Sequence, residues 1–129
     1  MDKTASRSLA EKNVDDFLVK HPDAEVHRLP NGDFSIRMSA AVLTGWSKEQ
    51  TSVAFIVPAA FPVQRPDCFW TDGDLMLQGG QPPANSQMNP PHPVHPGMRW
   101  FSYHPNVWDV RDTVETYWHL IQGRLLQNR

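Results

Sequence analysis

The stretch that decides the fold runs from Met98 to Leu126 and reads MRWFSYHPNVWDVRDTVETYWHLIQGRLL. It holds three of the five tryptophans of the chain and ends in the clearest amphipathic helix pattern of the sequence. Asp112 and Glu115 have the form of a capping box, and the apolar residues that follow recur every three or four positions. We therefore predict a C-terminal helix that begins near Asp112 and packs one face on a core.

A proline-rich segment precedes this stretch. Residues 75–99 show little periodicity and contain six prolines. Proline has no amide donor and a fixed φ, which disfavours both a helix and a central strand. Loops of this length in a compact domain are usually either functional or disordered. We expect 75–99 to be a long loop that flanks a site and carries His92 and His95.

The first half of the chain has the pattern of one helix and several strands. An approximate apolar stripe predicts a helix from Ser6 to Lys20, ended by His21-Pro22. Asn31-Gly32 between two apolar runs is a strong hairpin signal. The runs Ser52–Pro58 and Cys68–Trp70 add a third and a fourth strand. The expected fold class is α+β: an N-terminal helix, a four-stranded antiparallel meander, the long loop and the C-terminal helix.

Length and composition restrict the class of protein. A chain of 129 residues makes a single domain over 1–129, with residues 1–5 expected to be flexible. A net charge of −2 argues against a general nucleic-acid or membrane-surface role. The absence of a long apolar run or a signal-peptide core predicts a soluble, cytoplasmic protein. The single cysteine, Cys68, excludes disulfides within the chain, and we interpret it as a small buried hydrophobic residue.

The order of these elements and two motifs resemble the ubiquitin-conjugating (UBC) fold. In that fold a strand ends in a Y-P-x-x-P-P turn, and an active-site loop later runs to a tryptophan before a helix. Here Phe61–Pro66 reads FPVQRP at the turn, and Trp108 precedes the helix. Three features are similar to the bacterial branch called prokaryotic ubiquitin-conjugating family E: Pro66–Asp72 (PDCFWTD), the proline-rich loop and the Trp100–His104 element WFSYH. The resemblance covers roughly Ala24 to Leu126.

The resemblance implies a component of a bacterial ubiquitin-like conjugation pathway. Its expected partners are a ubiquitin-like protein and an adenylating activating enzyme, with a JAB-type metalloprotease in the same system. No cofactor, nucleic acid or membrane is expected. The chain departs from the family in one respect: the region of the nucleophilic cysteine reads Trp100-Phe101-Ser102. Two functions therefore remain open, a transferase with a non-cysteine site and a non-catalytic module that binds the ubiquitin-like protein or bridges the pathway.

Ser102 and His104 are the candidate catalytic pair. Residues i and i+2 of an extended segment lie on the same side, and histidine is the side chain whose pKa suits a general base. Ser102 would accept the ubiquitin-like C-terminus as an oxyester, with His104 as its base. The alternative is a serine bonded to backbone and a polar histidine before proline. The expected supporting residues are Trp100, Asn106, Trp108 and Asp109.

A metal site on His92, His95 and His104 is a weaker hypothesis. No acidic residue lies between Asp74 and Asp109 to complete it, and the surrounding prolines tend to splay the rings. We expect no bound metal.

Overall fold

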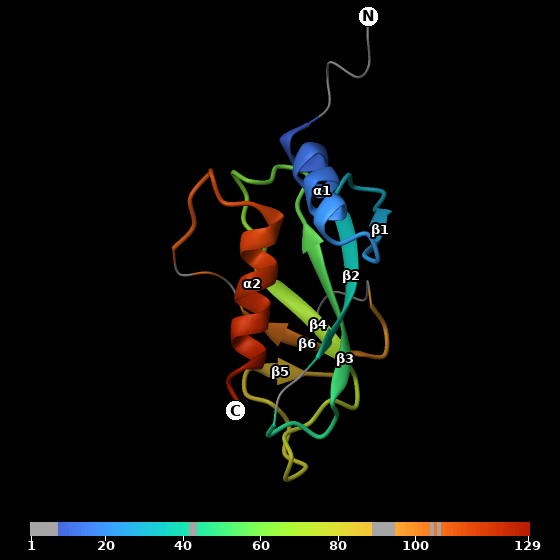
Figure 1. The fold of residues 1–129 in the computed structure, drawn as a ribbon, viewed down its shortest axis with the longest axis vertical. Helices are drawn as coiled ribbons and strands as arrows, with labels where there is room; N and C mark the ends of the chain where they lie inside the picture. The colour runs from blue at the N-terminus through green and yellow to red at the C-terminus, as the bar shows by residue number, and fades with distance from the viewer. Residues whose placement is uncertain (1–7, 42–43, 89–94, 104, 106) are drawn as a thin grey trace, which may run out of the picture.

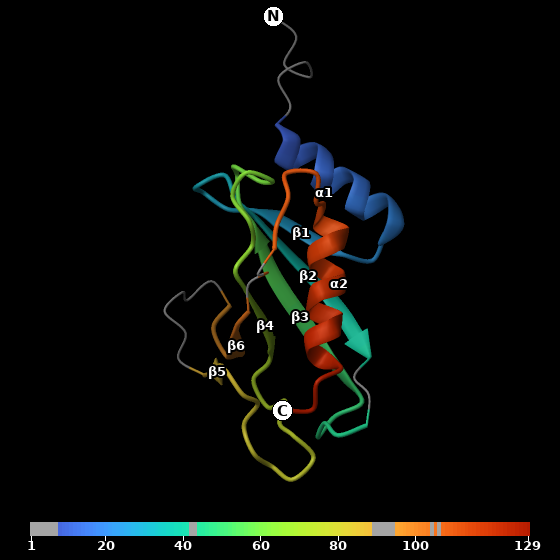
Figure 2. The same cartoon turned by 90° about the vertical axis from the view of Figure 1, so that its left-hand side faces the viewer.

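The computed structural model describes residues 8–41, 44–88, 95–103, 105 and 107–129. Within these residues two helices are present. They pack on one face of an antiparallel sheet, which Figures 1 and 2 show from two directions. The class is α+β, as the sequence predicts. Neither helix in the described part of the chain is long and apolar enough to cross a membrane.

The first helix, α1, spans Leu9–Lys20. Ser8 caps it by accepting a hydrogen bond from the backbone N–H of Glu11 (3.1 Å). The helix buries Ala10, Val14 and Phe17, and the residue before Pro22 ends it. The expected start at Ser6 is not described, because residues 1–7 lie outside the described part of the chain.

The predicted meander is present. Strands β1 (Glu25–Arg28), β2 (Phe34–Ala41), β3 (Gln50–Val57) and β4 (Cys68–Asp72) pair in sequence order, each antiparallel to the next. The hairpin falls at Asn31-Gly32, where Gly32 takes a φ of +93°. Only glycine adopts this backbone conformation without a steric cost, which explains the strength of the sequence signal.

The sheet extends beyond the expected four-stranded meander: over the described residues it has six strands, in the order β1-β2-β3-β4-β6-β5. The extra strands are β5 (Ser86–Gln87), within the segment expected to be a loop, and β6 (Met98–Ser102). β6 lies between β4 and β5, so both of its edges are hydrogen-bonded, and its buried residues Met98, Arg99 and Phe101 do not form an alternating apolar pattern. Arg99 is buried on the helix side and donates to the Ser86 hydroxyl (3.2 Å), while Trp100 lies on the other face.

The sheet separates two clusters of buried side chains. The main core lies between the sheet and the helices, where Phe55 contacts the rings of Phe17, Tyr117 and Trp118. A smaller cluster lies on the face that the helices leave open. It consists of Ala54, Cys68, Trp70 and Met98, with Ile56 and Trp100 packed against it.

The closing helix, α2, spans Val114–Leu125 and begins one residue later than a cap at Asp112 would give. Its capping box is formed by Thr113 and Thr116, each side chain accepting from the other's backbone N–H. A threonine side chain can accept the backbone hydrogen bond at either position of a capping box. The sequence therefore offers two possible boxes one residue apart, Asp112 with Glu115 and Thr113 with Thr116, and the second is formed. The hydroxyl of Tyr117 is shared between two carbonyl oxygens, those of Cys68 (3.1 Å) and Tyr103 (2.9 Å).

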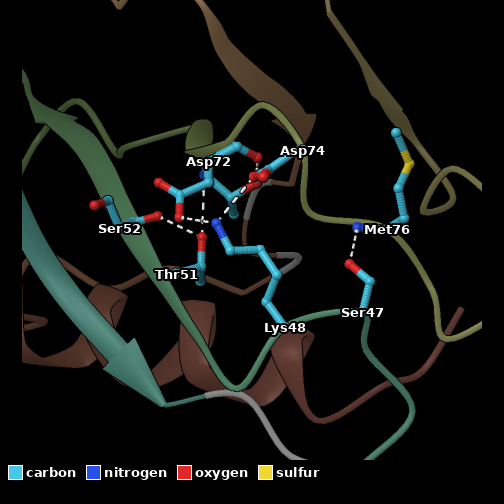
Figure 3. A network of polar contacts seen from close by, with 8 residues as sticks. Ser47, Lys48, Thr51, Ser52, Asp72, Asp74 and Met76 are labelled. Carbon is cyan, nitrogen blue, oxygen red and sulfur yellow. Dashed lines mark hydrogen bonds and ion pairs between the residues drawn. The ribbon is translucent and has the colours of Figure 1, made fainter.

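A polar network joins two loops at the end of the sheet near the C-terminus (Figure 3). Lys48 donates to the carboxylates of Asp72 (2.7 Å) and Asp74 (2.9 Å), and Thr51 accepts from the backbone N–H of Asp72 (3.0 Å). Nearby, the indole of Trp46 donates to the carbonyl of Leu125 (2.7 Å), which fixes the end of α2 to the same loops.

Tyr117→Phe tests the contribution of the shared hydroxyl. We expect a loss of about 1–2 kcal/mol in the free energy of unfolding, because two carbonyl groups lose a buried donor. Urea denaturation followed by tryptophan fluorescence measures it. Tyr103→Phe is the matched control, since its hydroxyl bonds no described residue, and it should change stability by less than about 0.5 kcal/mol. Equal effects of the two variants would contradict this assignment.

Candidate functional site

The segment between β6 and α2 is held against the turn that follows β3. The indole N–H of Trp108 donates to the carbonyl of Pro62 (2.9 Å), and its ring meets Phe61 edge-on at 5.6 Å. Arg65 donates from its guanidinium to the carbonyl of Pro105 (2.6 Å). The structure thus brings together two of the motifs singled out in the sequence, the F-P-x-x-x-P turn and Trp108, across more than forty residues of chain.

Ser102 is the last residue of β6 and is exposed. It lies directly opposite Cys68 in the β4–β6 register, so the two side chains share the open face of the sheet. Its backbone N–H donates to the carbonyl of Asn85 (2.9 Å), and its hydroxyl makes no hydrogen bond with a described residue. The hydroxyl is therefore accessible from solvent at the start of the anchored segment.

Three of the predicted site residues lie outside the described part of the chain. They are His92, His104 and Asn106. The proposed proton transfer from Ser102 to His104 and the support from Asn106 therefore stay predictions.

Cys68 has the properties of a buried structural residue. It is 8 % exposed, and burial raises the pKa of its thiol to about 12. At neutral pH the thiol form prevails, and the thiol form is a poor nucleophile. Its carbonyl accepts from Tyr117, so its backbone belongs to the core as well. The interpretation of Cys68 as a small buried side chain agrees with this environment.

Trp100 and Asp109, both predicted to support the site, occupy different places. Trp100 lies opposite Trp70 on the open face, and neither indole N–H has an acceptor among the described residues. Asp109 lies in the turn before α2 and accepts from the guanidinium (2.9 Å) and the backbone N–H (2.8 Å) of Arg111. The hydrogen bond from the Arg111 guanidinium is the main cause of the lowered pKa of the Asp109 carboxyl.

His95, predicted to flank the site, packs over the open face instead of beside Ser102. Its ring meets Trp70 edge-on at 4.8 Å, and its Nε2 lies 3.2 Å from the Ser35 hydroxyl. It precedes β6, whereas Ser102 ends that strand. Burial, and then the positive charge of Arg37, lower the pKa of His95 to about 4. The ring is therefore neutral at physiological pH.

A hollow of about 260 Å³ opens on the same face beside Cys68. Its walls come from the β1–β2 hairpin and from the turn after β3, with Trp70 and Cys68 among its lining residues. Polar and charged side chains line it: Asn31, Asp33, Gln64, Arg65 and Asp67. This grouping leaves no signal in the sequence, because its members come from two segments, 31–33 and 64–67, that are separated by thirty residues. Among the described residues, no three His, Cys, Asp or Glu side chains are arranged to hold a metal ion.

Thiol labelling tests the environment of Cys68. We expect native Cys68 to react with iodoacetamide at pH 7.5 at least about a hundredfold more slowly than an exposed cysteine, because burial suppresses the thiolate. The matched control is Ser102→Cys combined with Cys68→Ala, which moves the thiol to the exposed neighbour on the same face. Similar rates for the two proteins would contradict the assignment, and unfolding in urea should remove the difference.

The pH dependence of stability tests His95. In the unfolded chain its ring protonates near pH 6.5, its ordinary value, but in the folded protein only near pH 4. The contribution of His95 is therefore full above pH 6.5 and is lost as the pH falls toward 4, by on the order of 3 kcal/mol. His95→Gln should flatten the fall in urea midpoint across this range, while His27→Gln, at an exposed position, is the control. If the urea midpoint of His95→Gln fell with pH as steeply as that of the unchanged protein, the lowered pKa assigned to His95 would be contradicted.

Comparisons of the chain with protein-family models, with curated proteins and with solved structures gave no match.

Proposed function

We propose that this protein acts in a bacterial ubiquitin-like conjugation pathway, with a UBC-like fold related to prokaryotic ubiquitin-conjugating family E. One observation carries the proposal. After an N-terminal helix and a meander in sequence order, the segment that follows Ser102 is fixed by Trp108 and Arg65 to the F-P-x-x-x-P turn. An exposed hydroxyl near the anchored residues Pro105 and Trp108 is a suitable acceptor for an extended C-terminal tail.

In the proposed reaction, Ser102 accepts a ubiquitin-like protein from its activating enzyme. The hydroxyl oxygen of Ser102 attacks the activated C-terminal carbonyl, and His104 takes the hydroxyl proton. The new ester bond replaces the bond to the activating enzyme's leaving group, which departs with its electron pair. Asn106 or backbone N–H groups stabilise the oxyanion. An amine of the target then attacks the ester and releases Ser102.

Accessibility favours Ser102 over Cys68 as the acceptor. The two side chains are neighbours across β4 and β6, yet Ser102 is exposed and Cys68 is 8 % exposed with a raised pKa. An ester is less reactive toward amines than a thioester, so the site needs stronger electrostatic activation than a cysteine enzyme would.

A second function, a non-catalytic module that binds the ubiquitin-like protein or bridges other components, is favoured by a different observation. Two valines next to the Trp108–Pro62 contact project into solvent, with Val63 79 % and Val107 87 % exposed. Exposed apolar side chains on both sides of one anchored contact offer a surface for a partner protein. The same surface is compatible with both functions.

Reconstitution with the cognate activating enzyme, ATP and the ubiquitin-like protein separates the two. The catalytic proposal predicts a covalent adduct that hydroxide cleaves, that Ser102→Ala abolishes and that Cys68→Ala leaves unchanged. His104→Asn should slow its formation by about a hundredfold or more, the usual effect of losing a general base.

The remaining outcomes are also informative. Binding of the ubiquitin-like protein without an adduct would reject the transferase and retain the module. An adduct lost in Cys68→Ala would reject Ser102 as acceptor. Neither adduct nor binding would reject a role in this pathway.

A further inference from the structure

β1 covers only the first half of β2. The four residues of β1 pair with residues 34–37 of β2, but β2 continues to Ala41. Over the second half, Met38–Ala41, β3 pairs with one side of the strand through residues 50–53. No described residue pairs with the other side. A strand edge of four residues is therefore open where β1 ends.

The hairpin fixes which backbone groups face this edge. The N–H of Leu29 donates to the carbonyl of Asp33 (2.8 Å) beside the turn. Because backbone groups point to alternate sides along a strand, the odd-numbered residues from Arg37 onward direct theirs toward β1. The N–H and C=O groups of Ser39 and Ala41 consequently point out of the open edge, and those of Met38 and Ala40 point to β3.

Two hollows lie at the two ends of this edge. One, of about 430 Å³, is bounded by the α1–β1 connection and by Arg37, Met38 and Ser39. The other, of about 320 Å³, lies between Ala40–Ala41 and the end of α2, where Leu125 and Leu126 line it. Figure 2 shows β2 running past β1 beside α2. An added strand in line with β1 would pass from the first hollow to the second.

We propose that the edge Met38–Ala41 binds an extended peptide segment of a partner protein by strand addition. The segment donates to and accepts from the backbone of Ser39 and Ala41. Its residue beside Ala40 is apolar and enters the hollow lined by Leu125 and Leu126. Its residue opposite Ser39 is acidic, within diagonal reach of Arg37 on the open face.

Charge supports the acidic position. Arg37 is exposed and its guanidinium donates to the sulfur of Met98 (3.1 Å), but it pairs with no carboxylate among the described residues. Lys20, which lines the same hollow, is likewise without a described partner. Asp23 and Glu25 line that hollow too and would repel an acidic side chain. The position of the acidic residue along the bound peptide therefore matters more than the total charge of the peptide.

The chemistry of the edge favours a partner peptide over a second copy of this chain. The residues are Met, Ser, Ala and Ala, without the lysine or proline that usually protects exposed edges. Pairing two such four-residue edges would bury far less than the roughly 600 Å² per partner of a stable dimer. A peptide adds side-chain contacts in both hollows. The edge adjoins the C-terminal end of α2 and does not include Ser102. Peptide binding there therefore does not depend on the reaction proposed for Ser102.

Binding of a designed peptide tests the proposal. The probe is a fluorescein-labelled octapeptide in which valine alternates with threonine and one central threonine is replaced by glutamate. Ser39→Pro removes the outward amide without removing a β2–β3 hydrogen bond, and should weaken binding by about tenfold or more. Ser39→Val keeps the amide and is the matched control. Arg37→Gln should weaken binding about threefold, and only for the glutamate peptide.

Amide exchange provides a second readout. In the free protein, the amides of Ser39 and Ala41 should exchange rapidly, whereas those of Met38 and Ala40 exchange slowly; the peptide should protect Ser39 and Ala41. Protection of Ser39 without peptide, equal binding by Ser39→Pro and Ser39→Val, or no binding at about 1 mM peptide would overturn the proposal. Self-association that Ser39→Pro abolishes would assign the edge to a second copy and overturn it too. Thermal unfolding checks that each variant is folded.

Discussion

The hydroxyl of Tyr117 joins the closing helix to the two strands that lead to the candidate site. It comes from the face of α2 that packs on the sheet, and it bonds the carbonyl that begins β4 and the carbonyl that follows β6. Its ring meets Phe55 at the centre of the core. One side chain thus fixes the closing helix to the sheet and sets the starting point of the segment that leads to Trp108. Burial raises the pKa of Tyr117 well above its usual value, so the donor stays protonated.

The parts of the fold that local chemistry determines could be predicted from the sequence. Asn31-Gly32 needs a positive φ, Pro22 ends a helix, and β2 alternates apolar and polar residues, so each leaves a local signal. β6 left none, because its buried residues lie on both faces of the strand and one of them, Arg99, is charged. The start of α2 was uncertain by one residue because neighbouring acidic and hydroxyl residues can both form a cap.

The candidate site, too, could be predicted only in part from the sequence. The sequence indicated Trp108 and the F-P-x-x-x-P turn separately, and the structure shows that they touch. It also indicated that Cys68 is a small buried side chain, from its position on the strand that follows the F-P-x-x-x-P turn. The hollow beside Cys68 could not be predicted, because Asp33 and Asp67 come together only through the pairing of four strands. The position of His95 over Trp70 likewise depends on where β6 enters the sheet.

The place of β6 in the sheet also has a consequence for how the molecule assembles. β1 to β4 are joined by shorter connections, whereas β6 reaches β4 only after the long segment from Gly73 to Gly97. Closing that loop costs more chain entropy than closing the hairpins, so we expect β1 to β4 to pair before β6 docks. The surface around Ser102, at the end of β6, is then completed only when this strand docks between β4 and β5.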